Sequence, residues 1–412
     1  MSAILDKLLK GQKVEWKTLG DVSVLYGGLT GKNKADFENG NAKYVSYKNI
    51  FANLAVDLQN LGTVKANDNE KQHFIKHGDI LFTGSSETQA EAGISSVVTE
   101  HPIEKIYLNS FSFGLRFNDD VELMPEFTKF LFRGDLMRTQ IARTASGVTR
   151  FNISKERFKK IQVPIPPLDV QAEIVRILDA FTAVTAELTA ELTAELTMRE
   201  KQYQYYRDKL LTFSDNEIIW KSLGDLVLPT QNIKWKETLS SYRYIDLSSV
   251  DKVNNNIGET LEISSKNAPS RAQKIVKEAD IIFATTRPTQ MRVAIIPKQF
   301  NEQIASTGYC ILRANQEEVI PKWIYYNLSL ARFKAYLEEN QSGVAYPAIS
   351  DGLVKEFMIP VPSLKEQKRI VEILDKFETL THSITQGLPK EITLRQQQYE
   401  YYREQLIDFP KN

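Results

Sequence analysis

One glycine-rich segment near the N-terminus has the composition of a loop that could hold a phosphate group. Gly27–Asn33 reads Gly-Gly-Leu-Thr-Gly-Lys-Asn, and phosphate loops use backbone N–H groups and a lysine in this way. Tyr26, however, stands where the motif needs its first glycine, and Asn33 stands where a serine or threonine must meet the metal ion. We therefore predict no nucleotide site here, although Lys32, Asn33 and Lys34 remain candidates for a loop that contacts DNA.

Two histidines have the spacing of a helical zinc site. His73 and His77 are four residues apart, but Phe74 occupies the position of the catalytic glutamate and Gly78 follows at once. The chain also lacks a nucleophile elbow, a dinucleotide fingerprint, a Cys/His cluster and the Asn/Asp-Pro-Pro-aromatic loop of amino-methyltransferases. The sequence therefore predicts structural or surface histidines, no metal and no catalytic residue.

Polar and basic residues gather instead in loops of each half of the chain. Arg, Asn, Gln, Ser and Thr are the side chains that read base edges in the major groove, and ordinary exposed loops have the same composition. The candidate DNA-contacting residues of the first half are Lys32, Asn33, Lys34, Ser85, Ser86, Arg143, Ser146, Gly147, Thr149, Arg150 and Asn152. Those of the second half are Lys234, Thr286, Arg287, Gln290, Arg292, Ser342, Gly343 and Tyr346.

Charge is balanced over the chain but is not evenly distributed. Lys+Arg and Asp+Glu both number 52, so the net charge alone indicates no partner. Residues 133–160 nevertheless carry eight basic and two acidic side chains, and residues 266–298 carry seven and two. Two separated basic segments fit a protein that contacts phosphates at two places, and they also fit two solvated surfaces.

Length and composition bound the class of protein. A chain of 412 residues with 42% hydrophobic and 25% charged residues suits two globular domains with connecting elements. No apolar run is long enough to span a bilayer, and the N-terminus has no signal-peptide pattern. Cys310 is the only cysteine, so we expect no internal disulfide and a cytoplasmic location.

An internal repeat organises the sequence. Residues 146–213 align without a gap on residues 342–409, and 29 of these 68 positions are identical. A second match pairs Trp16 with Trp220, and the intervening sequences have diverged and differ in length by eight residues. The chain is therefore a duplicated variable domain followed by a nearly constant segment. Residues before Trp16 resemble those before Trp220, so we predict that the chain termini lie close together.

The first constant segment predicts a long helix. No glycine or proline interrupts residues 168–213, and apolar residues recur every three or four positions, so the helix would be roughly 65 Å long. It contains Thr-Ala-Glu-Leu three times, each unit adding roughly 6 Å, which favours either an adjustable spacer or a plain helix-forming stretch. The second copy has Gly387 and Pro389 here, so we expect one helix to end near Gln386 and another to begin near Pro389.

The variable domains read as mixed α/β. Short β-like runs are predicted at 80–83, 97–99, 113–117, 281–284, 293–296 and 310–313, and helices at 125–143 and 321–339. The predicted fold class is α+β, with two domains related by a pseudo-two-fold axis and joined by long antiparallel paired helices. The predicted parts are an N-terminal helix (1–15), two target-recognition domains (16–167 and 214–362), a spacer helix (168–213) and C-terminal helices (363–412).

This layout closely resembles the specificity subunits of type I restriction–modification systems over the whole chain. The resemblance rests on Ile165-Pro166-Pro167-Leu168, on the duplicated Ile-Val-x-Ile-Leu-Asp-x-Phe and on the two Gln-Tyr-x-Tyr-Tyr-Arg ends. The Thr-Ala-Glu-Leu run is similar to the spacer repeat of one subgroup of that family. The resemblance implies a non-catalytic subunit whose two variable domains each read one half of a split, asymmetric double-stranded DNA target.

The resemblance also implies partners. Two methyltransferase subunits would dock on the helices and use S-adenosylmethionine to methylate adenine, and restriction (motor and nuclease) subunits with ATP and Mg would join them. The expected spacer and docking residues are Thr185, Leu188, Leu192, Leu196, Tyr203, Tyr206, Tyr399 and Tyr402. Two alternatives stay open at this point: a helical adaptor that does not touch DNA, and a DNA-binding regulator that acts alone.

Overall fold

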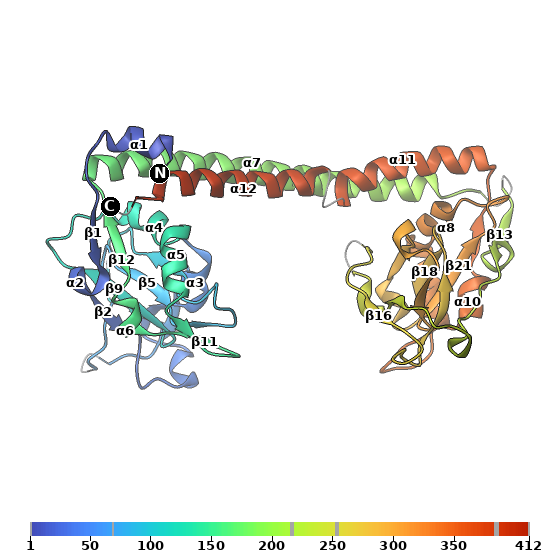
Figure 1. Cartoon of the computed structure of the whole chain (residues 1–412), viewed down its shortest axis with the longest axis horizontal. Helices are drawn as coiled ribbons and strands as arrows, with labels where there is room; N and C mark the ends of the chain where they lie inside the picture. The colour runs from blue at the N-terminus through green and yellow to red at the C-terminus, as the bar shows by residue number, and fades with distance from the viewer. Residues whose placement is uncertain (1, 68–69, 215–217, 252–254, 383–386, 411–412) are drawn as a thin grey trace. The chain divides into compact units, whose positions relative to one another are not determined.

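The structure is a computed structural model that describes residues 2–67, 70–214, 218–251, 255–382 and 387–410 (Figure 1). The chain folds into two compact units, Met1–Thr189 with Leu394–Asn412 and Ala190–Thr393. Each unit combines a sheet-rich domain with part of the long helices, which confirms the predicted α+β class. None of the described helices is long and apolar enough to cross a membrane.

The first unit is built on two main sheets and also has the smaller sheets β1-β12 and β10-β11-β6. A four-stranded sheet has the order β2-β9-β5-β7, and a three-stranded sheet has the order β4-β3-β8, in which β3 and β8 run parallel. Its strands are β1 (Glu15–Thr18), β2 (Ser23–Gly27), β3 (Ala42–Val45), β4 (Gly62–Val64), β5 (Ile80–Thr83), β6 (Ser85–Ser86), β7 (Ser95–Val97), β8 (Ile106–Leu108), β9 (Ser112–Phe117), β10 (Ala145–Ser146), β11 (Phe151–Ile153) and β12 (Gln162–Ile165). Its helices within this domain are α1 (Ala3–Leu9), α2 (Leu19–Val22), η1 (Lys34–Phe37), α3 (Tyr47–Ala52), α4 (Pro125–Leu131), α5 (Asp135–Ala142) and α6 (Lys155–Phe158).

The second unit repeats this plan. Its four-stranded sheet has the order β14-β21-β18-β19, and a second sheet has the order β16-β15-β20-β17 with β15 and β20 parallel. The strands are β13 (Trp220–Ser222), β14 (Val227–Leu228), β15 (Tyr242–Ile245), β16 (Leu261–Ile263), β17 (Ala272–Val276), β18 (Ile281–Ala284), β19 (Val293–Ile295), β20 (Gln303–Ser306), β21 (Tyr309–Ala314) and β22 (Met358–Pro360). Its helices are η2 (Gly224–Leu226), η3 (Trp235–Glu237), η4 (Leu247–Ser249), η5 (Pro288–Gln290), η6 (Lys298–Phe300), α8 (Pro321–Leu328), α9 (Ala331–Asn340), α10 (Asp351–Glu356) and α11 (Leu364–His382).

The central strands β5 and β18 have the bounds that the sequence predicts. All four residues of each strand are buried, because each lies between two neighbours in its sheet and is covered by helices. The predictions of one helix at 125–143 and one at 321–339 are wrong in one respect, because each of these segments forms two shorter helices. The first breaks before α5, where Gly134 is extended, and the second breaks before α9, where Leu330 is extended. A Cβ at Gly134 would lie 2.0 Å from Ile407, so α5 starts where α12 packs closely.

The spacer helix α7 (Leu168–Leu210) is continuous over 43 residues, as predicted. The corresponding part of the second copy is divided into α11, which ends at His382, and α12 (Gly387–Ile407). The predicted break is therefore confirmed, although Gln386 itself lies outside the described residues. Gly387 has φ +76°, and the left-handed conformation favours glycine at this position.

The helices of the two constant segments pack as antiparallel pairs inside each unit. In the first unit Phe181 of α7 stacks on Tyr402 of α12, and the Thr182 hydroxyl donates to the Tyr399 hydroxyl at 3.1 Å. In the second unit Tyr206 of α7 stacks on Phe377 of α11. Thus each unit holds one end of α7 against a helix from the other copy of the repeat.

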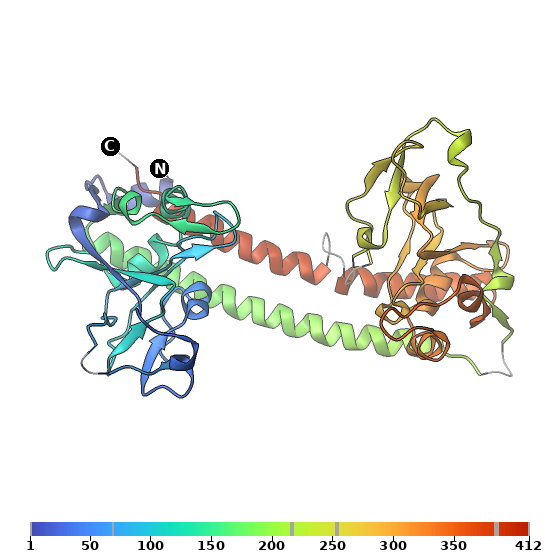
Figure 2. The same cartoon turned by 90° about the horizontal axis from the view of Figure 1, so that it is seen from below.

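The chain ends meet within the first unit, as the repeat predicts. The Ser2 hydroxyl donates to the Gln405 carbonyl, and the Trp16 indole N–H donates to the Pro410 carbonyl at 2.9 Å. Leu5 of α1 is buried in the same core cluster as Leu406 of α12. Both views show α1 beside the end of α12 (Figures 1 and 2).

Candidate nucleic-acid interface

A hairpin carries five of the eleven predicted DNA-contacting residues of the first unit. Strands β10 and β11 pair with each other, and β11 also pairs with β6, so that Ser85 lies opposite Asn152. Gly147 makes the turn possible, because a Cβ there would lie 1.9 Å from the Arg150 carbonyl oxygen. The tip is open to solvent: Ser146, Gly147, Thr149 and Arg150 are exposed. We call residues 145–153 the first hairpin.

Arg150 projects from this hairpin in a defined orientation. Its Nε donates to the hydroxyl of buried Ser85 at 3.0 Å, and its guanidinium lies over the Phe111 ring at 5.9 Å. Arg150 lines a pocket of about 500 Å³ beside the hairpin. The other residues that line this Arg150 pocket are Tyr47, Phe51, Ser85, Ser86, Glu87, Glu91 and Thr149. The pocket therefore combines a cation, two carboxylates and two aromatic rings at an open surface.

The second unit has a matching hairpin with different side chains. Residues 342–348, which we call the second hairpin, pair through Ser342 and Ala348, and a Cβ at Gly343 would lie 2.9 Å from the Tyr346 carbonyl. Thr286 pairs with Ala348, as Ser85 pairs with Asn152 in the first unit. Tyr346 occupies the repeat position of Arg150 and is 73% exposed.

One arginine of the loop after β18 contacts this second hairpin. Arg287 is exposed and lies over the Tyr346 ring at 5.6 Å, while its backbone N–H donates to the Pro347 carbonyl. Arg292 donates to the Leu247 carbonyl and to Gln290, which orders that side chain. Lys234 lies apart from this cluster in sequence, is exposed and pairs with Glu237 at 3.2 Å.

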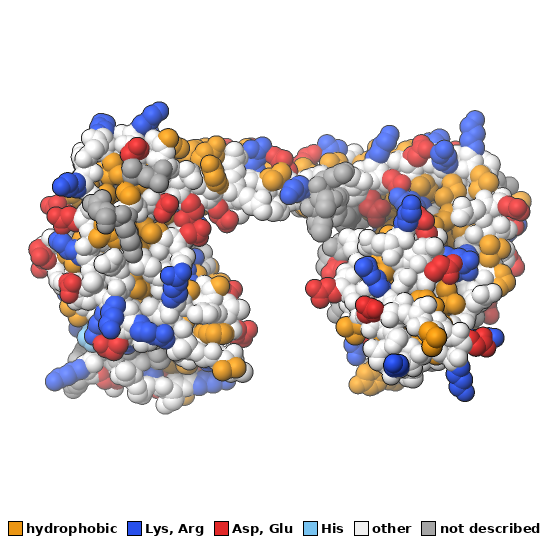
Figure 3. Space-filling view, viewed as in Figure 1, with side chains coloured by type: hydrophobic (Ala, Val, Ile, Leu, Met, Phe, Trp, Pro, Cys, Tyr) orange, Lys and Arg blue, Asp and Glu red, His pale blue; other side chains and the backbone are white. Residues whose placement is uncertain are grey.

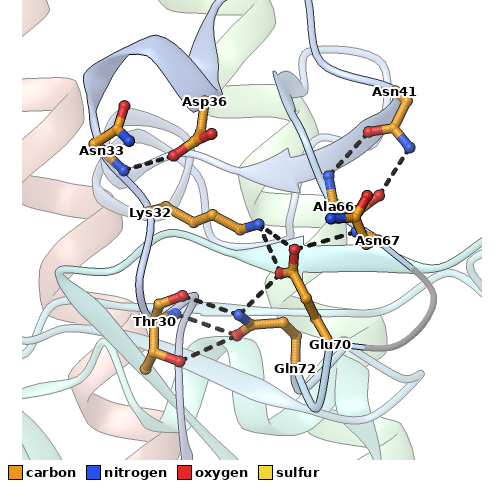
Figure 4. A network of polar contacts seen from close by, with 9 residues as sticks. All are labelled: Thr30, Lys32, Asn33, Asp36, Asn41, Ala66, Asn67, Glu70 and Gln72. Carbon is orange, nitrogen blue, oxygen red and sulfur yellow. Dashed lines mark hydrogen bonds and ion pairs between the residues drawn. The ribbon is translucent and has the colours of Figure 1, made fainter.

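The predicted loop at Lys32 is held by internal contacts. Lys32 forms an ion pair with Glu70 at 2.6 Å and its side chain is only 8% exposed (Figure 4). Asn33 caps η1 by accepting from the Ala35 N–H, and Asp36 completes the capping box. Lys32 and Asn33 therefore shape this loop in the structure, although Asn33 is exposed like Lys34.

Two half-buried arginines of the first basic segment stabilise the domain. Arg133 donates to the carbonyls of Ser95, Ile50 and Asn53, and Arg138 donates to those of Ala90 and Ala92. Burial lowers the pKa of each guanidinium to about 10. Their guanidinium groups therefore serve mainly to bind backbone carbonyls, whereas Arg143 is exposed. On the face shown in Figure 3, Lys and Arg are mixed with Asp and Glu in both units.

The tyrosines at the ends of the constant helices divide into inward and outward rings. Tyr203 is only 7% exposed, so its ring is not available to a partner in this structure. Tyr206 and Tyr402 stack on Phe377 and Phe181, as described above. Tyr206 is still 38% exposed, but the rings of Tyr205 and Tyr401 are more open, each 60% exposed and separated by the repeat distance, and neither is among the predicted docking residues. Of the spacer residues, Leu188 is exposed, while Thr185, Leu192 and Leu196 are half-buried.

Sequence reasoning also missed the residues that support the hairpins. Phe111 and Tyr47 are distant in sequence from the loops they contact, so no motif indicates them. Gln171 could have been found, because it aligns with Gln367 in the repeat. Both glutamines are buried, and each links the start of a constant helix to the backbone of its own domain. Gln171 accepts from the Met124 N–H, and Gln367 accepts from the Ile320 N–H. No group of His, Cys, Asp or Glu in the described part of the chain could hold a metal ion.

Comparison with known proteins agrees with this architecture. A type I restriction enzyme specificity subunit of Escherichia coli is 39% identical over 279 residues, which cover 63% of this chain and 65% of that protein. A Haemophilus influenzae protein named as such a subunit is 31% identical over 98% of both chains. A chain from a solved structure on the assembly and conformational transition of a type I restriction–modification system superposes with a TM-score of 0.69. That likeness, at 16% identity over 96% of this chain and 98% of the other, concerns the fold alone.

The family model extends over both halves of the duplication. The model of the type I restriction modification DNA specificity domain matches residues 12–198 and again residues 220–394. Each match contains one sheet-rich domain, its hairpin and the start of the following constant helix. The chain therefore belongs to the type I restriction–modification DNA specificity family.

Proposed function

We propose that this chain is the DNA-recognition subunit of a type I restriction–modification complex and that each unit reads one half of a bipartite target. Its place in the DNA specificity family supports the recognition role. The observation that carries the two-half arrangement is the pair of hairpins. They share a turn and a strand pairing, but Arg150 stands in one where Tyr346 stands in the other. Because these side chains differ, the two halves of the target would differ too.

Base readout would come from the exposed residues around the hairpins. Arg150, Thr149 and Asn152 in the first unit, and Arg287 and Gln290 in the second, are exposed and have the donors and acceptors that read the major groove. Arg143 and Lys34 would contact phosphates, which fixes register without reading sequence. Ser85 and Lys32 would act indirectly, by positioning Arg150 and the 30–36 loop.

Chemistry would reside on partner subunits. The specificity family is non-catalytic, so S-adenosylmethionine would be bound by two methyltransferase subunits and ATP with Mg by restriction subunits. Tyr205 and Tyr401 would belong to the docking surfaces for the methyltransferases, because aromatic rings exposed on a helix favour protein interfaces. Their equivalent repeat positions would give two similar docking surfaces for two copies of one partner.

The Thr-Ala-Glu-Leu units of α7 would set the unread gap between the half-sites. Deleting Ala186–Thr189 removes one unit, roughly 6 Å of helix, which approaches two base-pair steps of about 3.4 Å. Methylome sequencing of the deletion should report a shorter gap with both half-sites unchanged. An active complex with an unaltered gap would contradict the spacer role.

Duplex binding tests the proposal against its alternatives. The full chain, with and without its co-purified methyltransferase, is titrated with duplex DNA over a range of salt concentrations. A recognition subunit should bind with a salt-dependent affinity that the methyltransferase strengthens. An adaptor would bind the methyltransferase but no DNA, and a solo regulator would bind its DNA equally well alone. Either of those results would overturn the proposal.

A further inference from the structure

We propose that the Arg150 pocket reads one G·C base pair of the first half-target, with Arg150 on the guanine and Glu91 on the cytosine. This inference rests on the proposed function and adds the identity of a base pair to it. It concerns only the first unit, because the second unit builds its hairpin surface from other residues.

Arg150 has the geometry of a guanine reader. The Ser85 hydroxyl accepts from its Nε at 3.0 Å, and the Phe111 ring supports the guanidinium plane at 5.9 Å. No described residue accepts a hydrogen bond from its two Nη groups, so these remain available for a ligand. A guanidinium held in this way loses little rotamer freedom on binding, and its two-pronged donor set matches O6 and N7 of guanine.

Glu91 supplies an oriented acceptor in the same pocket. Its Oε2 accepts from the Thr88 hydroxyl at 2.9 Å and from the Ser86 hydroxyl at 3.3 Å, and no described residue donates to Oε1. The turn that carries Glu91 is held in place, because Arg138 donates to the Ala90 and Ala92 carbonyls. The carboxylate is therefore presented at the pocket in one orientation.

A carboxylate at a DNA-binding surface is unfavourable unless it meets a donor. Phosphates repel it, whereas the N4 amino group of cytosine donates to Glu or Asp in the major groove. Guanine O6 and cytosine N4 lie next to each other across one base pair, so a cation and a carboxylate in one pocket match that edge. An A·T pair would place the N6 donor before the arginine and the O4 acceptor before the glutamate. A T·A pair presents O4 and N6 as a G·C pair presents O6 and N4, but it places the thymine methyl group where the arginine needs N7.

The second unit lacks this combination. The corresponding loop, residues 285–292, contains Arg287 and Arg292 but no acidic residue, and Tyr346 replaces Arg150 on the hairpin. Substitutions in the Arg150 pocket should therefore change one position of the first half-site and leave the second half-site as it is.

The test maps target preference for the whole complex. Genomic methylation is sequenced in cells that carry the full system with wild-type chain, Arg150→Ala, Arg150→Lys, Glu91→Gln or Arg143→Ala. We expect the wild-type first half-site to contain a G·C pair whose discrimination falls roughly 5- to 150-fold in both Arg150 variants. Arg150→Lys keeps the charge without the paired donors, so it covers the case in which Arg150→Ala does not fold. Glu91→Gln should relax the same position, and Arg143→Ala should weaken methylation at all sites without changing the preference.

Two results separate failure of this inference from failure of the proposed function. A wild-type bipartite target whose first half contains no G·C pair overturns the inference alone, as do active Arg150 variants with unchanged preference. A wild-type complex without any bipartite preference overturns the proposed function and the inference together.

Discussion

Asp79 in the first unit and Asp280 in the second occupy the same place beneath equivalent sheets, and both are buried. Arg116 binds Asp79 through two hydrogen bonds of 2.7 and 2.6 Å, and Arg313 binds Asp280 at 2.9 and 2.7 Å. The two units differ in the loops that follow these aspartates. Ser85-Ser86 begins one loop and Thr286-Arg287 begins the other, and the two loops differ in length and charge. The duplication has thus kept this buried ion pair and changed the side chains of the loop and the hairpin that follow it.

This difference separates positioning from readout. Glycine turns at the equivalent positions 147 and 343 place residues 150 and 346 at matching sites, where one copy has a cation and the other has a phenol. A fold that holds the turn in both units can therefore accept different target bases in each. Matched substitutions in the two units test which residues position the hairpin and which residues read the target.

The largest effect is expected at the buried carboxylates. Asp79→Ala leaves Arg116 and the Tyr26 hydroxyl, which donates to Asp79 at 2.6 Å, without their acceptor, and should destabilise the first unit by about 3–5 kcal/mol. Asp280→Ala should destabilise the second unit somewhat less, because no tyrosine hydroxyl donates to Asp280 among the described residues. Hydrogen exchange of β9 and β21 amides measures each unit separately. Equal loss of protection in both units from one substitution would contradict this account.

A smaller effect is expected at the hairpin glycines. Gly147→Ala places a Cβ 1.9 Å from a backbone carbonyl and should distort the first hairpin at a cost of about 1–3 kcal/mol. Gly343→Ala places it at 2.9 Å, so the second hairpin should tolerate the change better. Methylation mapping should show weaker discrimination in the first half-site for Gly147→Ala, and preserved preference there for Gly343→Ala. The reverse order of effects would count against the matched-hairpin description.

The two tryptophans that begin the domains should differ by about 1 kcal/mol, the worth of one hydrogen bond. Trp16 donates to the Pro410 carbonyl, whereas the buried indole N–H of Trp220 has no partner in the described part of the chain. Trp16→Phe should therefore lower the stability of its unit more than Trp220→Phe does, although both lose the same ring area. Urea unfolding followed by hydrogen exchange gives the two values. A larger loss for Trp220→Phe would contradict the assignment.

The smallest effect is expected at Glu404, which accepts from the Asp135 N–H at 2.8 Å and pairs with Arg403. Burial raises the pKa of this carboxyl, so the folded state favours its protonated form. Its contribution to stability is therefore present below the ordinary glutamate pKa and is lost as pH rises through the raised value. Glu404→Gln should flatten this pH dependence in the first unit and leave the second unit unchanged. An unaltered stability–pH profile would show that another group is responsible.

Much of the fold follows from local patterns. The bounds of β5 and β18 and the start of α7 could be predicted because buried apolar runs and an uninterrupted helical stripe are strong signals, although α7 ends at Leu210 and not at residue 213. The likeness between the residues before Trp16 and those before Trp220 predicted the meeting of the termini, which packing in the first unit confirms. The break at Gly134 could not be predicted, because it depends on how closely Ile407 approaches from the other end of the chain.

The site is harder to predict than the fold. Lys32 is of a residue type that commonly contacts DNA, yet it forms an ion pair with Glu70. The two residues are far apart in sequence, so the pairing could not be predicted. Charge counting included Arg133 although its donors all face backbone carbonyls. Phe111 and Glu91, which complete the surroundings of Arg150, become visible only when the strands have brought their loops together.

Exchange of one recognition domain tests the central claim most directly. Residues 16–167 are replaced by the corresponding segment of a family member with a different target, and genomic methylation is sequenced in cells with the full system. The account predicts that one half-site changes to that of the donor while the other half-site and the gap stay the same. A simultaneous change in both half-sites, or an unchanged target in an active complex, would contradict the division of reading between the two units.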